Sequence, residues 1–172
     1  MDPVVTLVLG GARSGKSRYA ESLVEKTGAG LYVATAQVRD GEMAERVRLH
    51  KDRRGDVWKT LEEPLNLASV IANHAGPNHM ILVDCLTLWL SNLMEDGRDV
   101  GVETAGLCNA LKEAKGPVTL VSNEVGMGIV PDNALARDFR DHQGRLNQAV
   151  AAAADRVVFV AAGLPLTLKD EA

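Results

Sequence analysis

Residues 7–22 read LVLGGARSGKSRYAES, and this stretch decides the fold class of the chain. Within it, Gly10 to Ser17 match the pattern G-x-x-x-x-G-K-[ST]. An apolar run precedes the pattern and a helix-forming run follows it, which is the strand–loop–helix setting of a phosphate-binding loop (P-loop). The alternative is a glycine-rich turn with a lysine in it by chance. The agreement of pattern and setting favours the P-loop.

The residue types in this loop suit a triphosphate. Glycines allow positive φ angles, so that backbone N–H groups can point inward at phosphate oxygens. The N-terminus of the following helix adds partial positive charge. We expect the Lys16 ammonium to reach the β- and γ-phosphates and the Ser17 hydroxyl to bind Mg²⁺. The expected ligand is therefore a nucleoside triphosphate with Mg²⁺.

An acidic residue, Asp84, closes the apolar run MILVD at residues 80–84. In P-loop proteins an acid at such a strand end holds the Mg²⁺ shell. The alternative is an aspartate that caps the helix after the strand. Because the P-loop is already indicated, we favour the metal role for Asp84.

Apolar strands alternate with helices along the rest of the chain. The expected strands are 4–9, 31–35, 80–84, 118–122 and 157–161; the expected helices are 17–26, 42–54, 65–74, 86–94, 103–114 and 134–154, with Gly144 as a candidate break. Gly163 and Pro165 predict a hairpin to a short edge strand at 166–168. This order predicts an α/β fold: a RecA-like P-loop NTPase sandwich of three layers, with a mostly parallel sheet and a C-terminal antiparallel edge hairpin. We expect residues 1–172 to form a single nucleotide-binding domain.

Composition argues against a nucleic-acid-dependent ATPase. The net charge is −4, the pI is near 5.6 and aromatic residues make up 3% of the chain, so neither a basic surface nor base-stacking platforms are indicated. We expect no nucleic-acid partner.

No membrane or export segment is indicated. The apolar runs are too short to span a membrane, and the N-terminal residues do not resemble a signal peptide. The two cysteines have neither metal-ligand nor disulfide spacing, so we expect a cytoplasmic protein.

The segment 42–64, EMAERVRLHKDRRGDVWKTLEEP, carries potential phosphate ligands. On a helix, Arg46, His50, Arg53 and Arg54 would lie at i, i+4, i+7 and i+8, roughly on one face. Such a stripe could grip a triphosphate. The spacing alone favours a solvated, charged helix at least as strongly.

Several stretches are more specific. They are GGARSGKSRYAE (10–21), LYVATAQ (31–37), EMAERVRLHKDRR (42–54), WKTLEEP (58–64), SNEVGMGIVP (122–131) and RDHQGRLNQAVAAAAD (140–155). Together they resemble the bifunctional adenosylcobinamide kinase / adenosylcobinamide-phosphate guanylyltransferase family of cobalamin biosynthesis. The similarity covers nearly the whole chain, and the stretch NEVGMGIVP and the doubled glycine of the P-loop are its most specific parts.

The resemblance implies two reactions. A nucleoside triphosphate, ATP or GTP, phosphorylates the hydroxyl of adenosylcobinamide. GTP then transfers GMP to that phosphate through a guanylyl-histidine, giving adenosylcobinamide-GDP and pyrophosphate. The family's H-x-x-R-R segment corresponds to His50, Arg53 and Arg54. A neutral imidazole is a competent nucleophile at pH 7, and the two arginines would offset charge on the leaving pyrophosphate.

The resemblance also extends the expected nucleotide site. With the P-loop and Asp84, the set is Gly10, Gly11, Ala12, Arg13, Ser14, Gly15, Lys16, Ser17, Arg18, Ala34, Thr35, Ala36, Lys51, Asp52, Arg53, Arg54, Glu62 and Asp84. For Glu62 the alternative is helix N-terminal charge before Pro64. Guanine preference is implied by the family alone, because the chain has no N-K-x-D segment.

Three further expectations complete this picture. The loop 123–131 would contact the corrinoid or a neighbouring subunit, or serve as a plain connection. The resemblance suggests a homotrimer. For His74, His79 and His142 we expect surface or helix-end positions. The alternative function is a single-function P-loop kinase for a small metabolite, in which His50 has no covalent role.

Overall fold

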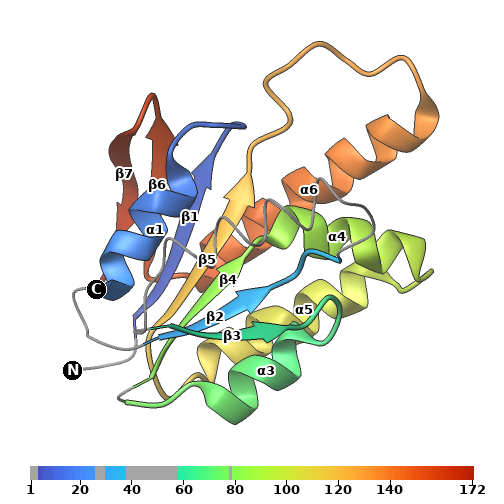
Figure 1. Cartoon of the computed structure of the whole chain (residues 1–172). Helices are drawn as coiled ribbons and strands as arrows, with labels where there is room; N and C mark the ends of the chain where they lie inside the picture. Colours follow the sequence, from blue (N-terminus) through green and yellow to red (C-terminus); the bar gives the residue numbers. More distant parts are fainter. Residues whose placement is uncertain (1–3, 26–29, 38–57, 78) are drawn as a thin grey trace.

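The computed structural model describes residues 4–25, 30–37, 58–77 and 79–172. Its strands form one seven-stranded sheet in the order β3-β2-β4-β5-β1-β6-β7 (Figure 1). The strands are β1 (Val5–Gly10), β2 (Gly30–Ala34), β3 (Trp58–Glu62), β4 (Met80–Asp84), β5 (Val118–Asn123), β6 (Arg156–Ala161) and β7 (Leu164–Asp170). All neighbours pair in parallel except β6 and β7, which form an antiparallel hairpin.

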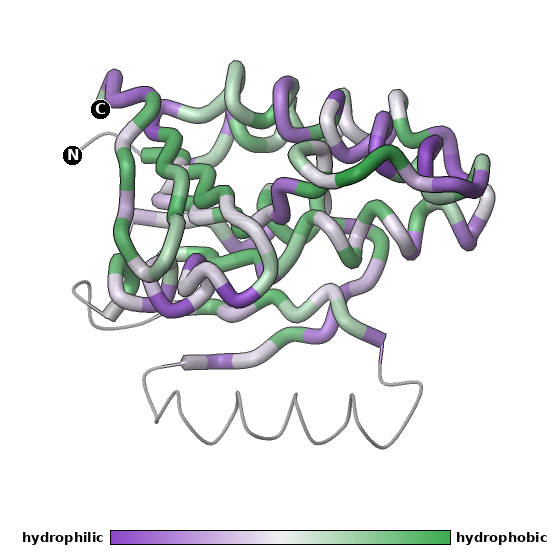
Figure 2. Tube along the Cα trace, turned by 90° about the horizontal axis from the view of Figure 1, so that it is seen from above, coloured by the Kyte–Doolittle hydropathy of each residue, from purple (hydrophilic) through white to green (hydrophobic). Residues whose placement is uncertain are grey.

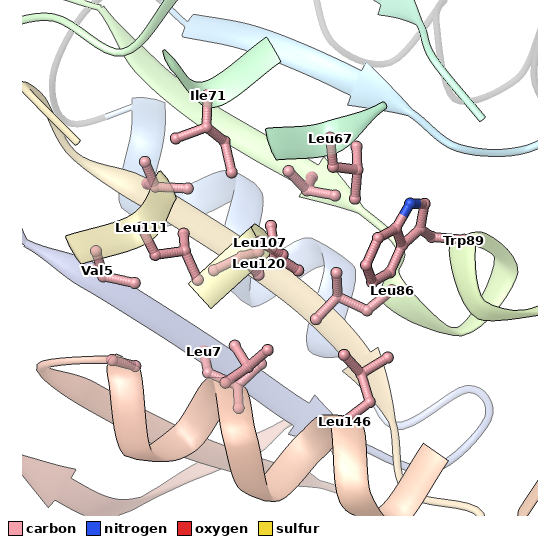
Figure 3. Close-up of a cluster of buried hydrophobic side chains, with 14 of the residues drawn as sticks. Val5, Leu7, Leu67, Ile71, Leu86, Trp89, Leu107, Leu111, Leu120 and Leu146 are labelled. Carbon is pink, nitrogen blue, oxygen red and sulfur yellow. The ribbon is translucent and has the colours of Figure 1, made fainter. Parts of the chain in front are cut away.

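Helices lie on both faces of this sheet. Helix α1 (Lys16–Glu25) covers one face, and the other face carries α3 (Leu67–His74), α4 (Leu86–Glu95), α5 (Val100–Lys112) and α6 (Ala134–Ala153) (Figure 1). The larger apolar cluster fills the space between the sheet and these four helices. Figure 3 shows Leu7 and Leu120 of the sheet facing Leu107, Trp89 and Leu146 of the helices. Each fully buried large apolar side chain stabilises the fold by about 1.5–3 kcal/mol.

The fold predicted from sequence is confirmed: a mostly parallel α/β sandwich with a C-terminal antiparallel hairpin. Three details differ. Strand β3, at the edge beside β2, was not predicted. The helix around Gly144 is continuous from Ala134 to Ala153, so the break expected there is wrong. The edge strand β7 is longer than expected, running from Leu164 to Asp170, because six of its positions pair with β6.

The helix expected at residues 42–54 lies outside the described residues. Of the helices in the described ranges, none is both long enough and apolar enough to cross a bilayer.

Candidate nucleotide-binding site

The P-loop lies between the end of β1 and the start of α1, as its pattern predicts. Arg13 has a φ of 57° and Gly15 a φ of 94°, so the chain turns through left-handed conformations here. A Cβ on Gly10 would lie 2.5 Å from the Ser14 Oγ atom and 2.6 Å from the Val160 carbonyl oxygen. Only glycine therefore fits at position 10 without displacing the loop.

Two polar groups in this loop are poised for an anion. Lys16 is only 9% exposed, and its Nζ donates to the Gly11 carbonyl oxygen at 3.1 Å. The Ser14 hydroxyl oxygen is buried and has no hydrogen-bond partner among the described residues. Space is open around the Gly11 Cα. A phosphate in the loop would give the Ser14 hydroxyl a partner and the Lys16 ammonium an opposite charge, so the residues fit the expected triphosphate.

The C-terminal hairpin supports the loop from one side. At its turn, the Gly163 N–H donates to the Ser14 carbonyl oxygen at 2.8 Å. A Cβ added to Gly15 would lie 3.1 Å from the Gly163 Cα. Gly163 itself has a φ of 77°, which glycine adopts readily. The hairpin turn and the P-loop thus pack backbone to backbone.

The carboxylate of Asp84 lies on the α1 face of the sheet, at the end where the P-loop starts. Strand alternation places it on the same face as Leu82, which packs with Tyr32 and Ala20 in the cluster under α1. The Tyr32 hydroxyl donates to the Asp84 Oδ2 at 2.8 Å. The N-cap position of α4 belongs to Cys85, so the helix-capping alternative for Asp84 is wrong.

Ser17 and Asp84 fit a Mg²⁺ ion that also binds phosphate. Ser17 is half-buried in the first turn of α1, next to Lys16. A hydroxyl and a carboxylate are oxygen donors, and Mg²⁺ usually takes one or two protein ligands with phosphate oxygens and waters. Within the described ranges no group of three or more His, Cys, Asp or Glu side chains could hold a metal by itself. The donor set therefore suits a nucleotide-bound cation.

Next to Asp84, side-chain hydrogen bonds connect the residues that follow the carboxyl ends of β2 and β4. The buried Thr35 Oγ1 donates to the Cys85 carbonyl at 2.8 Å and accepts from the Cys85 N–H at 2.9 Å. The Asn92 side chain donates to the carbonyls of Thr35 and Pro64 at 2.8 and 3.0 Å. Burial, and secondarily the Asp84 charge, raises the pKa of the Cys85 thiol to about 11. That thiol stays protonated at neutral pH and is no nucleophile.

On the other side of Asp84, β5 ends beside the P-loop strand, with Asn123 in register with Gly10. The Asn123 N–H donates to the Thr87 Oγ1 at 2.9 Å, and its carbonyl accepts from the Asn147 side chain at 3.1 Å. The Glu124 N–H donates to the Gly10 carbonyl at 3.0 Å. The loop that follows, part of the expected 123–131 contact region, therefore starts at the nucleotide site.

The structure brings several other predicted residues to the same edge. Ala34 pairs in register with both Asp84 and Glu62, so these three strand ends form one row. Ala36 follows two residues later and is half-buried, whereas Glu62 is exposed. The neighbouring Glu63 accepts, through its Oε1, from the N–H groups of residues 65 and 66, just before α3 begins.

The remaining predicted residues divide into two groups. Ala12, Arg13 and Arg18 lie exposed in and after the P-loop. His50, Lys51, Asp52, Arg53 and Arg54 lie outside the described residues.

The other histidines lie on the surface or at a helix end, as expected. His74 ends α3 and is exposed, and His79 is exposed. His142 is partly exposed, with its Nε2 3.6 Å from the Asp138 carboxylate.

Sequence reasoning missed the supporting groups: Tyr32, Thr87, Asn92, Asn147 and Gly163. The hydrogen bonds that the side chains of Tyr32, Thr87, Asn92 and Asn147 make at this edge join residues 24 or more positions apart, so no local spacing marks them. The available signal was the polar residues inside otherwise apolar elements, which must find partners when buried.

Comparison with known proteins identifies the family of the chain. Residues 6–168 match the family model described as "Cobinamide kinase / cobinamide phosphate guanyltransferase". The chain is 49% identical over 168 residues to the bifunctional adenosylcobalamin biosynthesis protein CobP of Pseudomonas aeruginosa PAO1, covering 96% of this chain and 97% of that one. It is 41% identical over 181 residues to the bifunctional adenosylcobalamin biosynthesis protein CobU of Escherichia coli K12, covering 96% and 100%.

Among solved structures, the RadB recombinase superposes with a TM-score of 0.55 at 16% identity, covering 92% of this chain and 74% of that one. That likeness shows the RecA-like P-loop fold alone. With a family model matched from β1 to β7 and relatives aligned over nearly their full length, the chain belongs to the cobinamide kinase / cobinamide phosphate guanyltransferase family.

Proposed function

We propose that the chain phosphorylates the hydroxyl of adenosylcobinamide with a nucleoside triphosphate and then transfers GMP from GTP to the new phosphate. The products of the second step are adenosylcobinamide-GDP and pyrophosphate. The observation that carries the proposal is a complete P-loop in a chain of this family, with a buried Lys16 and a Ser14 hydroxyl that has no partner among the residues the structure describes. Kinase and guanylyltransferase chemistry both start from a triphosphate held in such a loop.

For the kinase step, the loop positions the γ-phosphate. Backbone N–H groups and the Lys16 ammonium offset the charge on the β- and γ-oxygens while the substrate hydroxyl attacks in line. When bound, Mg²⁺ held by Ser17 and Asp84 supplies further charge neutralisation. The hydrogen bond from the Gly163 N–H to the Ser14 carbonyl supports the loop from the side of the hairpin.

For the guanylyl transfer, His50 is the proposed nucleophile. Its neutral imidazole nitrogen attacks the α-phosphorus of GTP, the α,β-anhydride bond breaks and pyrophosphate leaves. Arg53 and Arg54 offset the leaving charge. A phosphate oxygen of the corrinoid then attacks the same phosphorus, and the imidazole leaves. The support for these roles is the H-x-x-R-R segment in a member of this family; the remaining nucleotide contacts are proposed for Arg18, Ala34, Ala36, Lys51, Asp52 and Glu62.

Isotope transfer separates this proposal from a single-function kinase. Incubation with adenosylcobinamide and γ-labelled triphosphate should label the corrinoid as its phosphate. Incubation of that phosphate with α-labelled GTP should then move the label into adenosylcobinamide-GDP, with release of one pyrophosphate. A labelled phosphate without any GMP transfer would support the single-function kinase and contradict the proposal.

We further propose that the protein acts as a homotrimer in the cytoplasm, in one nucleotide-binding domain spanning residues 1–172. Both cysteines are free thiols, which suits a reducing compartment.

The exposed edge of the sheet supports the oligomer. Strand β7 ends the sheet and carries Leu164, Leu166 and Leu168 at 72, 61 and 58% exposure. Beyond Leu168 the chain becomes hydrophilic, as Figure 2 shows close to the C-terminus. An apolar edge strand of this kind suits burial against another copy.

A charge on this edge should dissociate the assembly. We expect sedimentation equilibrium to report three chains per particle for the natural sequence and a shift toward one chain for Leu166→Lys. Val102→Lys is the matched control, because Val102 is 68% exposed but lies on α5. A trimer that survives Leu166→Lys, or a natural protein that is monomeric, would contradict this assignment.

A further inference from the structure

The hydrogen bond between Tyr32 and Asp84 joins two residues 52 positions apart. In the β2–β4 register Tyr32 is opposite Leu82 and Ala34 is opposite Asp84, so Tyr32 is the diagonal neighbour of the carboxylate. Its hydroxyl lies 2.8 Å from Oδ2. No side chain of the described residues donates to the Asp84 Oδ1. One oxygen of the carboxylate is thus fixed by the phenol, and the other is left for a ligand.

The tyrosine is itself held rigidly. Its side chain is buried, and its ring meets the Trp58 ring edge-on, with centroids 6.0 Å apart and planes at 86°. A Cβ on Gly30 would lie 2.7 Å from the Trp58 ring, so glycine at position 30 makes room for the indole. Packing therefore fixes the phenol, and the phenol fixes the carboxylate, before any ligand is present.

We propose that Tyr32 is a positioning residue for the nucleotide-bound cation: it orients the Asp84 carboxylate so that Oδ1 faces the phosphate site. The inference rests on the proposed function in one respect, the metal role of Asp84. Partners that orient metal-ligating carboxylates commonly set metal affinity although they never touch the metal. A preset carboxylate avoids the loss of side-chain freedom that binding would otherwise impose.

Tyr32→Phe tests the inference because it removes only the hydroxyl and keeps the ring. The probe is Mn²⁺, followed by electron paramagnetic resonance, with α,β-methylene GTP, in which the bond that His50 would cleave is replaced. We expect Tyr32→Phe to weaken Mn²⁺ binding to the protein–analogue complex by about ten-fold. Binding of the analogue in EDTA and the thermal midpoint should stay unchanged. Tyr19→Phe, at the chain's other tyrosine, should match the natural protein in each measurement.

Asp84→Asn separates failure of the inference from failure of the proposed metal site. If Tyr32 acts through Asp84, Tyr32→Phe should add nothing to the loss of Mn²⁺ affinity in Asp84→Asn. If Asp84→Asn weakens Mn²⁺ binding and Tyr32→Phe does not, only the positioning role is overturned. If Asp84→Asn leaves Mn²⁺ binding unchanged, the metal role of Asp84 is overturned and the positioning role with it. Equal losses of metal-free analogue binding and Mn²⁺ binding in Tyr32→Phe would also overturn it.

Discussion

Lys16→Ala is expected to lower the rates of both the kinase and the guanylyltransfer reactions by about 10²–10³-fold. This is the usual cost of removing one preorganised group that stabilises the charge developing in the transition state. Lys16 is nearly buried, and its Nζ lies 3.1 Å from the Gly11 carbonyl oxygen, inside the P-loop. Both proposed reactions need the same triphosphate held there. Steady-state assays with γ- and α-labelled GTP measure the two losses separately.

The matched control is Lys112→Ala, which removes an exposed ammonium from the last turn of α5. Its activities should equal those of the natural protein. Because Lys16 is nearly buried, thermal unfolding of the Lys16 variant must be recorded to show that the fold persists. If a folded Lys16→Ala protein kept either reaction at full rate, that reaction would not use this loop.

The prediction of the strand–loop–helix from sequence succeeded because its determinants are local. The conformations of Gly15 and Arg13, the buried Lys16 and the first turn of α1 all lie within one short stretch. The RecA-like, mostly parallel α/β sandwich followed from apolar runs that alternate with helices.

Strand β3 escaped prediction because its side chains do not show a buried face. Of Trp58–Glu62, three positions are exposed and two are half-buried, and the strand exists because it pairs with β2.

The break expected at Gly144 was wrong because buried side chains on the helix outweigh the low helix propensity of glycine. Glycine inside a helix costs only about 1 kcal/mol relative to alanine. The buried Leu146 and Val150 on the same helix more than offset that cost.

The support of the site depends on tertiary contacts that no spacing encodes. Tyr32 meets Asp84 only because β2 and β4 are neighbours in the register observed. Gly163 meets Ser14 only because the last hairpin folds back beside the first strand. The residues proposed to bind ligand were accessible from motif and resemblance, whereas the residues that hold them in place required the fold.

His50→Ala is expected to abolish GMP transfer, by at least about 10³-fold, as removal of a covalent nucleophile does. It should leave much of the phosphorylation of adenosylcobinamide, because the P-loop, Lys16 and Asp84 remain. The natural protein incubated with α-labelled GTP should acquire a protein-bound label that is labile in acid and stable in base, as a phosphoramidate is. The His50 variant should acquire none.

His74→Ala is the matched control for this loss. The P-loop follows the carboxyl end of β1, and β1 and β4 run in the same direction within the parallel sheet. His74 ends α3 just before β4 begins, so it lies toward the opposite end of the sheet from the P-loop. Its variant should keep the label and both rates. Equal loss of kinase and transferase activity in His50→Ala would assign His50 to triphosphate binding in general. Persistence of the label in His50→Ala would move the nucleophile to another residue. Only the split outcome, transfer lost and phosphorylation kept, requires a histidine that carries GMP between two substrates.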